Sequence, residues 1–316
     1  MTPLLEGQPH SLTAEQAAPA FYGPLEQYAV VHFSGADALA FLQGQLTCDV
    51  IGLPADRWVW AGYCTAKGRL LCTGILWREG NSACLILPAS QADAMAKRLR
   101  MFVLRAKVTI SVTGEDRQLI GMRLPVPDGI RSIPALRFPS QAHQCLISPD
   151  HTALRLAGDC GLTWIPTAAA KTLREGQPTG SPSAWDAVSV GLDEPWLAPA
   201  SQELYVPQML NLERIGGVSF TKGCYPGQEI VARSQHLGQV KRRLYRYRAE
   251  ATRLPVIGTR IVGHDAKPAG EVLRAASLDG HRCLLLAVIP TEMQDQALTL
   301  EDGTPLHAET PTHAAS

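Results

Sequence analysis

The sequence predicts an α+β protein, in which ferredoxin-like split βαβ units build a platform and a small antiparallel β-barrel follows. Three observations lead to this prediction. Residues 28–113 show strand-like and helix-like patterns in the order strand, helix, three strands, helix, strand, typical of a split α+β unit. A connection with four prolines at 124–139 precedes weaker strands and one helix that could form a similar second half. Residues 244–289 are rich in strands with little helical periodicity, which indicates the barrel.

Hydrophobic periodicity and turn residues delimit the elements of the first unit. Ser34 can cap the first helix, and Ser90 can open the second. The expected strands span residues 28–33, 57–64, 70–77, 82–87 and 107–113, and the expected helices span 35–46 and 90 to about 102.

The second half is expected to contain a helix near residues 167–174 and a short helix that Ser183 and Asp186 open as a capping box. We therefore expect the platform over residues 20–236, with a boundary between its two subdomains near 120–140. The barrel should occupy residues 237–316 and end in a frayed tail.

Composition and charge exclude several classes of protein. The 316 residues are 46% hydrophobic and 18% charged, with a formal net charge of zero, which argues against a broad electrostatic surface for nucleic acid or acidic membranes. Residues 1–20 contain no Lys or Arg and no long apolar run, so they resemble neither a secretory signal nor a transit peptide. No apolar run reaches the roughly 20 residues that span a bilayer. We therefore expect a soluble, cytoplasmic, monomeric protein.

The eight cysteines are scattered, and no two of them form a C-x-x-C pair. This spacing predicts neither a zinc knuckle nor a disulfide framework, and it suits a reducing compartment. The nine histidines form no H-x-x-x-H pair. We therefore expect no metal site, although distant cysteines could still converge on an iron–sulfur cluster.

The string KGCYPGQE at residues 222–229 has the strongest chemical character in the chain. Its two glycines and its proline impose an unusual backbone path that holds Cys224 in place. A helix that starts near Gly227, together with the ammonium of Lys222, would favour the thiolate form of Cys224. The alternative is that Cys224 is a small buried hydrophobic residue in a glycine turn.

This string, with IGGVSFT at 215–221 before it and IVAR at 230–233 after it, resembles the signature of the YgfZ family. FLQGQLTCDV at 41–50 and VPQMLNL at 206–212 match the family as well, in the same order. The resemblance implies a folate-binding protein linked to iron–sulfur cluster maintenance and tRNA modification. It also implies a fold related to the aminomethyltransferase (T-protein) of the glycine cleavage system, which ends in a small barrel.

The resemblance also implies site residues. It assigns Cys224 and Lys222 to the chemistry, and it assigns tetrahydrofolate or a one-carbon derivative as the cofactor. The family's two folate-contacting aromatic residues fall on Tyr28 and Trp185, where aromatic faces could stack on a pterin. Gln228 and Glu229 are assigned to the same cofactor site. Both aromatic residues could instead belong to the core.

Several positions depart from the T-protein pattern. The Glu that pairs with the pterin falls on Gly191, while Asp193 and Glu194 are near it but displaced. The adjacent aspartates of T-proteins are replaced by Cys72 and Thr73, so the group that handles protons in aminomethyl transfer is missing. The frequent Asp before Ala-Lys-Gly is Thr65.

The sequence therefore favours a folate-binding accessory protein that supports assembly or repair of iron–sulfur enzymes, including those that thiolate tRNA, through transient contacts. A folate-dependent aminomethyltransferase is the first alternative, so whether the chain is an enzyme stays open. An RNA-binding accessory module is the second, because residues 241–248 hold five cations and two tyrosines that could contact an RNA backbone and bases.

Overall fold

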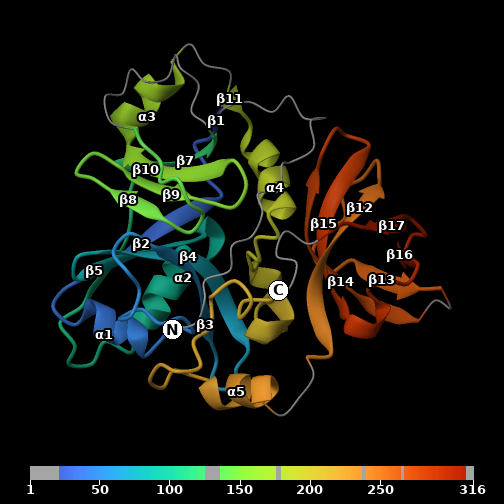
Figure 1. The fold of residues 1–316 in the computed structure, drawn as a ribbon, viewed down its shortest axis with the longest axis horizontal. Helices are drawn as coiled ribbons and strands as arrows, with labels where there is room; N and C mark the ends of the chain where they lie inside the picture. Colours follow the sequence, from blue (N-terminus) through green and yellow to red (C-terminus); the bar gives the residue numbers. More distant parts are fainter. Residues whose placement is uncertain (1–20, 125–135, 176–178, 237–239, 265–266, 311–316) are drawn as a thin grey trace.

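The computed structural model describes residues 21–124, 136–175, 179–236, 240–264 and 267–310. Two sheet lobes lie one above the other, and a barrel lies beside them, with helix α4 (Pro182–Gly191) between the barrel and the sheets (Figure 1). The first sheet is antiparallel throughout, whereas the second contains one parallel pair of strands, β1 and β11. The predicted α+β class with a carboxyl-terminal antiparallel barrel is confirmed.

The first lobe follows the predicted order of elements. Its strands pair antiparallel in the order β3-β4-β5-β2-β6. The elements are β2 (Tyr28–Ser34), α1 (Ala38–Gln43), β3 (Trp58–Cys64), β4 (Leu70–Glu79), β5 (Ser82–Pro88), α2 (Ala89–Arg100) and β6 (Thr109–Val112).

The first helix is shorter than expected, and neither predicted serine caps a helix here. The residue before α1 is Asp37, and its carboxylate accepts a hydrogen bond from Lys107 N at 2.7 Å instead of capping the helix. Pro88 precedes α2, so Ser90 already lies inside that helix. Asp37 therefore fixes the start of α1 through a contact across the lobe that local pattern could not predict.

The second lobe has the strand order β11-β1-β7-β10-β9-β8. Its elements are β1 (Phe21–Tyr22), β7 (Arg117–Arg123), β8 (Cys145–Ile147), β9 (Thr152–Arg155), β10 (Cys160–Pro166), α3 (Thr167–Arg174) and β11 (Thr179–Gly180). β7 pairs with β10 along its whole length, so residues 117–123 belong to the second lobe, and the subdomain boundary near 120–140 stays a prediction. Of the expected proline-rich connection, residues 125–135 fall outside the described ranges.

The barrel closes in the order β12-β15-β14-β13-β16-β17. Its strands are β12 (Arg242–Glu250), β13 (Arg260–Gly263), β14 (Pro268–Ser277), β15 (Arg282–Pro290), β16 (Leu298–Leu300) and β17 (Pro305–Ala308), with a short helix η4 (Thr291–Met293). Its interior forms a hydrophobic core of its own, whereas Leu244, Leu273 and Leu286 pack into the core of the platform. The first barrel strand begins at Arg242, and the division of the chain at residue 237 stays a prediction. The expected frayed tail at 311–316 lies outside the described part of the chain.

The segment between the second lobe and the barrel joins all three parts. It contains α4, the short helices η2 (Pro199–Ser201) and η3 (Pro207–Leu210), and α5 (Gln228–His236). Ser181 caps α4 by accepting a hydrogen bond from Ala184 N at 3.2 Å, with Pro182 in the first turn. The predicted cap at Ser183 is therefore wrong by two residues, because proline suits the first helical position and leaves the cap to the residue before it.

Among the described residues, no helix combines the length and apolar character needed to cross a membrane.

Candidate functional site at the Cys224 loop

The loop that carries Cys224 is fastened to the turn that follows α1. Lys222 Nζ donates hydrogen bonds to the carbonyls of Leu46 at 2.6 Å and Cys48 at 2.9 Å. Between those two residues, the Thr47 carbonyl accepts from Ser219 N at 2.9 Å, and Thr47 Oγ1 donates to the Gly217 carbonyl at 2.5 Å. The strings at 41–50 and 215–229 therefore form one structural unit, although about 170 residues separate them.

The end of the loop is fixed by two glycines that touch. Gly227 has φ of +80°, and a Cβ built on it would lie 2.5 Å from Gly68 N and Cα and from the Thr65 carbonyl. Gly68 itself has φ of +69° and closes the turn that begins at Thr65. Only glycine combines this backbone conformation with such a close approach. The two turns therefore pack backbone against backbone just before α5.

Gln228 closes the loop at the start of α5. Its Oε1 accepts from Tyr225 N at 3.3 Å, while its own N–H donates to the Tyr225 carbonyl at 3.1 Å. Farther along the chain, Gln208 Nε2 donates to the carbonyl of Val231 at 2.7 Å and ties α5 to η3. Glu229 points away from this unit: it is exposed and pairs with Arg233 at 3.3 Å on the same helix. These contacts give Gln228 a structural role, and the assignment of both residues to a cofactor stays a prediction.

Cys224 is the exposed cysteine of the chain, and the other seven are buried. Burial raises the pKa of Cys48, Cys72, Cys145 and Cys160 to about 12, so these thiols stay protonated near neutral pH. Nothing lies within 4 Å of a Cβ built on the preceding Gly223, so the loop is open to solvent there. The thiol of Cys224 is therefore accessible, and the alternative of a small buried residue in a glycine turn is wrong. The assignment of Cys224 to chemistry stays a prediction.

Lys222 has a different environment from the one expected. Its ammonium faces the carbonyls of Leu46 and Cys48 and lies 5.1 Å from the centre of the Tyr225 ring. Burial lowers the pKa of Lys222, and the neighbouring Cys48 and Asp49 oppose that shift. The helix that was expected to favour the thiolate begins at Gln228, beyond Tyr225, Pro226 and Gly227. Lys222 therefore fastens the loop, and its catalytic assignment stays a prediction.

Tyr28 lies in a second cluster, where the start of β2 meets α4 and β14. Its ring packs against Trp196 with centroids 4.6 Å apart, and Trp196 in turn meets Trp60 at 4.8 Å. The Tyr28 hydroxyl is buried and makes no hydrogen bond of normal geometry, although Ser189 is close. Burial raises the pKa of Tyr28 to about 12. Gln27 Oε1 is a second buried polar atom without a hydrogen bond, on the residue next to it.

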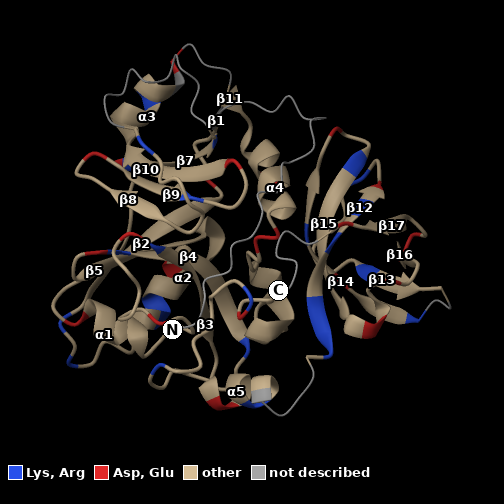
Figure 2. Cartoon of the chain, in the orientation of Figure 1, with Lys and Arg blue, Asp and Glu red and all other residues tan. Residues whose placement is uncertain are grey.

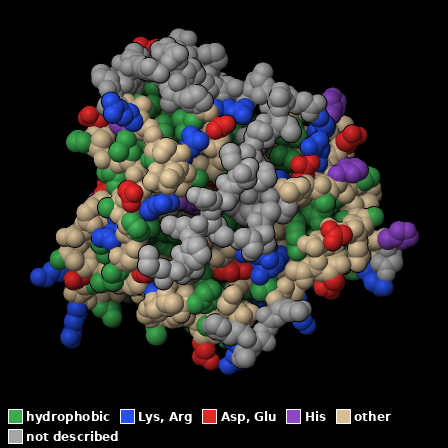
Figure 3. All heavy atoms as spheres, viewed as in Figure 1, with side chains coloured by type: hydrophobic (Ala, Val, Ile, Leu, Met, Phe, Trp, Pro, Cys, Tyr) green, Lys and Arg blue, Asp and Glu red, His purple; other side chains and the backbone are tan. Residues whose placement is uncertain are grey.

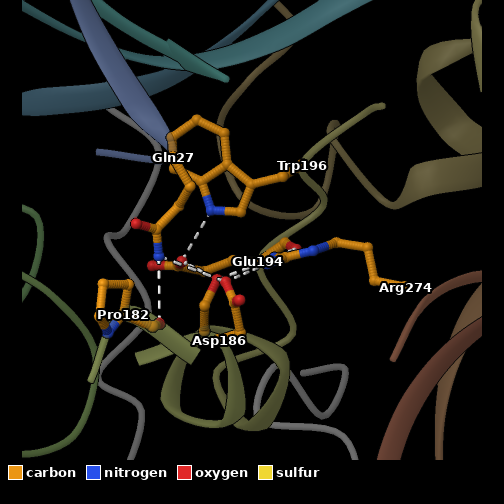
Figure 4. Close-up of polar contacts among 7 residues, drawn as sticks. Gln27, Pro182, Asp186, Glu194, Trp196 and Arg274 are labelled. Carbon is orange, nitrogen blue, oxygen red and sulfur yellow. Dashed lines mark hydrogen bonds and ion pairs between the residues drawn. The ribbon is translucent and has the colours of Figure 1, made fainter. Parts of the chain in front are cut away.

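The buried carboxylate of Glu194 accepts hydrogen bonds from other residues of this cluster (Figure 4). Its Oε2 accepts from Ser189 Oγ at 2.6 Å and from Trp196 Nε1 at 2.9 Å. Arg274 of the barrel donates to Ser189 Oγ at 2.8 Å and pairs with Asp186 at 3.4 Å. Burial raises the pKa of Glu194, while these hydrogen bonds and the charge of Arg274 oppose the rise. A carboxylate therefore lies near Tyr28, three positions after the Gly191 that replaces the expected Glu.

Trp185 packs inside the second lobe. Its ring lies over Gly121, where an added Cβ would come within 2.4 Å of the indole, and it meets Tyr22 edge-on at 5.3 Å. Trp185 is 1% exposed, so in this conformation its ring contributes to the core. Its assignment to folate stays a prediction.

The structure thus places the predicted residues in two regions. Cys224, Lys222, Gln228 and Glu229 lie on or next to α5 at one edge of the molecule, whereas the Tyr28 cluster lies near α4 (Figure 1). Sequence reasoning missed Trp196 and Arg274 and noted Glu194 only as displaced. The string DEPW at residues 193–196, after α4, was the available signal, because two neighbouring acidic residues between apolar ones are unusual in a loop that packs in a core.

Comparisons with known proteins agree with this fold. No protein-family model matches the chain. The tRNA-modifying protein YgfZ of Vibrio vulnificus is 30% identical over 300 residues, which cover 90% of this chain and 89% of that protein. The protein of the same name from Sodalis glossinidius is 31% identical over 288 residues, covering 87% and 86%.

Solved structures are similar to this chain as well, one of them over most of its length. It is the glycine cleavage system aminomethyltransferase T from Bartonella henselae, with a TM-score of 0.67 over 92% of this chain and 85% of that one. At 14% sequence identity this likeness shows a shared fold. The predicted relation to the T-protein fold is therefore confirmed.

The contact between Gly227 and Gly68 predicts a large difference between two alanine substitutions in one loop. Gly227→Ala forces a Cβ into backbone atoms at positive φ, so we expect it to lower the free energy of unfolding by roughly 2 kcal/mol or more. Gly223→Ala should change it by less than about 0.5 kcal/mol, because its Cβ meets only solvent. Urea unfolding of both variants measures this; equal effects would contradict the proposed packing.

The raised pKa of Glu194 predicts a pH-dependent stability. Because the folded state holds the proton more tightly than the unfolded state, this residue lowers stability as pH rises from its unfolded pKa of about 4.3 through the higher folded value. The variant Glu194→Gln has no proton to lose at this position. Its free energy of unfolding, relative to that of the unaltered chain, should therefore rise as the pH increases from about 4 to about 7. Urea unfolding across this range tests it, with exposed Glu229→Gln as the control. If the difference in free energy of unfolding between Glu194→Gln and the unaltered chain stays constant with pH, the pKa of Glu194 is not raised by folding.

Proposed function

We propose, because this chain belongs to the family of the tRNA-modifying protein YgfZ, that it binds a reduced folate and supports tRNA-modifying enzymes through the thiol of Cys224. Iron–sulfur enzymes that thiolate tRNA are the proposed clients, met through transient contacts. The observation that carries this proposal is the exposed Cys224 on a loop whose contacts fix its backbone on both sides.

The fold and the Tyr28 cluster support the folate part of the proposal. A pterin is a flat ring with hydrogen-bond donors and acceptors on its edge, and it needs an aromatic face and polar partners. Tyr28 and Trp196 supply aromatic faces, and the hydroxyl of Tyr28 and Oε1 of Gln27 are buried polar atoms in need of partners. Glu194 adds a carboxylate that is 5% exposed. These residues would hold the ring, and the folate would supply or accept a one-carbon unit.

The Cys224 loop supports the thiol part. A nucleophilic or sulfur-carrying cysteine must be reachable, and Cys224 meets that requirement while its seven counterparts do not. Lys222 and Thr47 hold the loop through backbone carbonyls, so the thiol can react without loss of the loop's anchorage. The chemical step itself would depend on the client enzyme.

Aminomethyl transfer is disfavoured by the residues at the T-protein acid positions. Cys72 is a buried thiol, and burial raises its pKa to about 12. Thr73 is buried as well, with Oγ1 donating to the Pro195 carbonyl at 2.7 Å and accepting from Leu197 N at 3.0 Å. Neither side chain can exchange a proton with a substrate amine near neutral pH.

An RNA-binding role for β12 is also disfavoured. Arg243 pairs with Glu213 at 2.7 Å, Arg246 with Asp193 at 2.8 Å, and Arg248 with Glu309 at 2.8 Å. These guanidinium groups are therefore committed to carboxylates inside the protein. Basic and acidic residues are scattered over both lobes and the barrel (Figure 2), and on the face in Figure 3 their side chains are interspersed.

The folate proposal predicts a specific effect of Tyr28→Phe. This change keeps the ring against Trp196 but removes the hydroxyl, so we expect tetrahydrofolate to quench indole fluorescence in both proteins and to bind the variant more weakly by roughly 1 to 2 kcal/mol. Tyr245→Phe in the barrel is the matched control and should bind like the unaltered chain. If Tyr28→Phe and the unaltered chain bind tetrahydrofolate with equal affinity, Tyr28 does not belong to the site. A separate titration with tRNA would test the RNA-binding alternative.

The thiol proposal predicts that a limiting dose of iodoacetamide labels Cys224 before any other cysteine, because the other seven are buried. Peptide mapping measures this directly. Cys224→Ala should change the free energy of unfolding by less than about 1 kcal/mol and abolish support of tRNA thiolation in cells that lack their own family member.

Cys283→Ala is the matched control for that experiment, because Cys283 is buried in the barrel core. It should lower stability and leave tRNA thiolation in place. If Cys224→Ala supports thiolation as well as Cys283→Ala does, the thiol is not the functional group.

A further inference from the structure

Three neighbouring strands of the first lobe bring a histidine, a glutamate and a cysteine onto one face of the sheet. His32 on β2 lies directly opposite Cys84 on β5, and Cys84 lies opposite Trp77 on β4. Side chains two residues apart on a strand share a face, so Glu79 lies on the same face as Trp77. The strands β2, β4 and β5 belong to the sheet in the lower left of Figure 1.

The ligand atoms of these residues are close together. One side-chain ligand atom from each of His32, Glu79 and Cys84 lies within 4.8 Å of the other two. We propose that these three side chains bind a divalent transition metal, with zinc as the best match. Nitrogen, carboxylate oxygen and thiolate sulfur are all zinc ligands, and tetrahedral zinc places ligand atoms roughly 3.5 Å apart. Small side-chain rotations would therefore close the site.

Glu79 is already oriented by partners outside the proposed ligand set. Its Oε1 accepts hydrogen bonds from Trp77 Nε1 at 2.9 Å and from Thr152 Oγ1, on the second lobe, at 3.2 Å. Hydrogen bonds of this kind orient metal-binding carboxylates and tune their affinity. Arg117, a cation whose charge acts on Cys84, is held over the Trp164 ring at 4.1 Å and donates to the Trp164 carbonyl at 2.9 Å. Its charge is thus already partly balanced.

Metal binding would require the thiol of Cys84 to lose its proton. Cys84 is fully buried and would bind the metal as thiolate, releasing one proton to solvent as the sulfur–metal bond forms. Three protein ligands leave a fourth tetrahedral position, which water would occupy. His32 and Glu79 are half-buried, so an ion can reach the site from solvent. Sequence pattern could not predict this cluster, because its ligands come from three separate strands.

Cobalt binding tests the proposal on a Cys224→Ser background, which removes the exposed thiol as a competing ligand. After treatment with a chelator, the chain should bind one equivalent of Co²⁺ with a thiolate-to-cobalt charge-transfer band, and Zn²⁺ should displace it. Cys84→Ser should lose the band, while Cys160→Ser, another buried strand cysteine, should keep it. Glu79→Gln and His32→Gln should each weaken Zn²⁺ binding at least about tenfold, measured against a zinc indicator.

Thr152→Val tests the orienting hydrogen bond and should weaken Zn²⁺ about tenfold while keeping the charge-transfer band. Circular dichroism and urea unfolding must show that each variant is folded. The proposal is overturned if the chelated chain binds no Zn²⁺ at micromolar concentration. It is also overturned if folded Glu79→Gln and Cys84→Ser bind Zn²⁺ as tightly as the chain from which they derive.

Discussion

The attachment of residues 217–222 to the turn at 46–48 is the interaction on which the candidate site depends. Lys222 donates hydrogen bonds to two carbonyls of that turn. Thr47 donates to the Gly217 carbonyl and accepts from Ser219 N. Each such hydrogen bond contributes roughly 1 kcal/mol net, but a buried carbonyl left without its donor costs more. The path of the loop, and with it the exposure of Cys224, therefore depends on a turn made by the first lobe.

Hydrogen bonds between distant segments also join the barrel to the platform. α5 is tied to η3 through Gln208, and η3 is tied to β12 through Asn211, whose Nδ2 donates to the Leu244 carbonyl at 2.8 Å. Arg274 links the barrel to α4 and to Glu194 in the same way. The barrel and the platform thus share partly buried polar contacts at two places. Gln208, Asn211 and Lys222, which belong to the strings that resemble the family signature, thus bind segments that are distant in the sequence.

Much of the architecture was predictable from local pattern. The strands of the first lobe, helix α3 and the barrel follow from hydrophobic periodicity, and the fixed backbone path around Cys224 follows from the glycines beside it. Contacts between distant segments were not predictable. Lys222 looked like a cation beside a thiol, yet its ammonium binds carbonyls more than 170 residues earlier in the chain. Likewise, the cations of β12 looked like an RNA surface, because one sequence does not show that their carboxylate partners lie on other segments.

A double-mutant cycle between Thr47→Val and Lys222→Met tests the central claim most directly. The two side chains hold the same loop on the same turn, so urea unfolding of the single and double variants should give a coupling energy of at least about 0.5 kcal/mol. Hydrogen exchange in both single variants should speed up around residues 217–228 first. Additive effects, with no local increase in exchange there, would show that this turn does not hold the Cys224 loop.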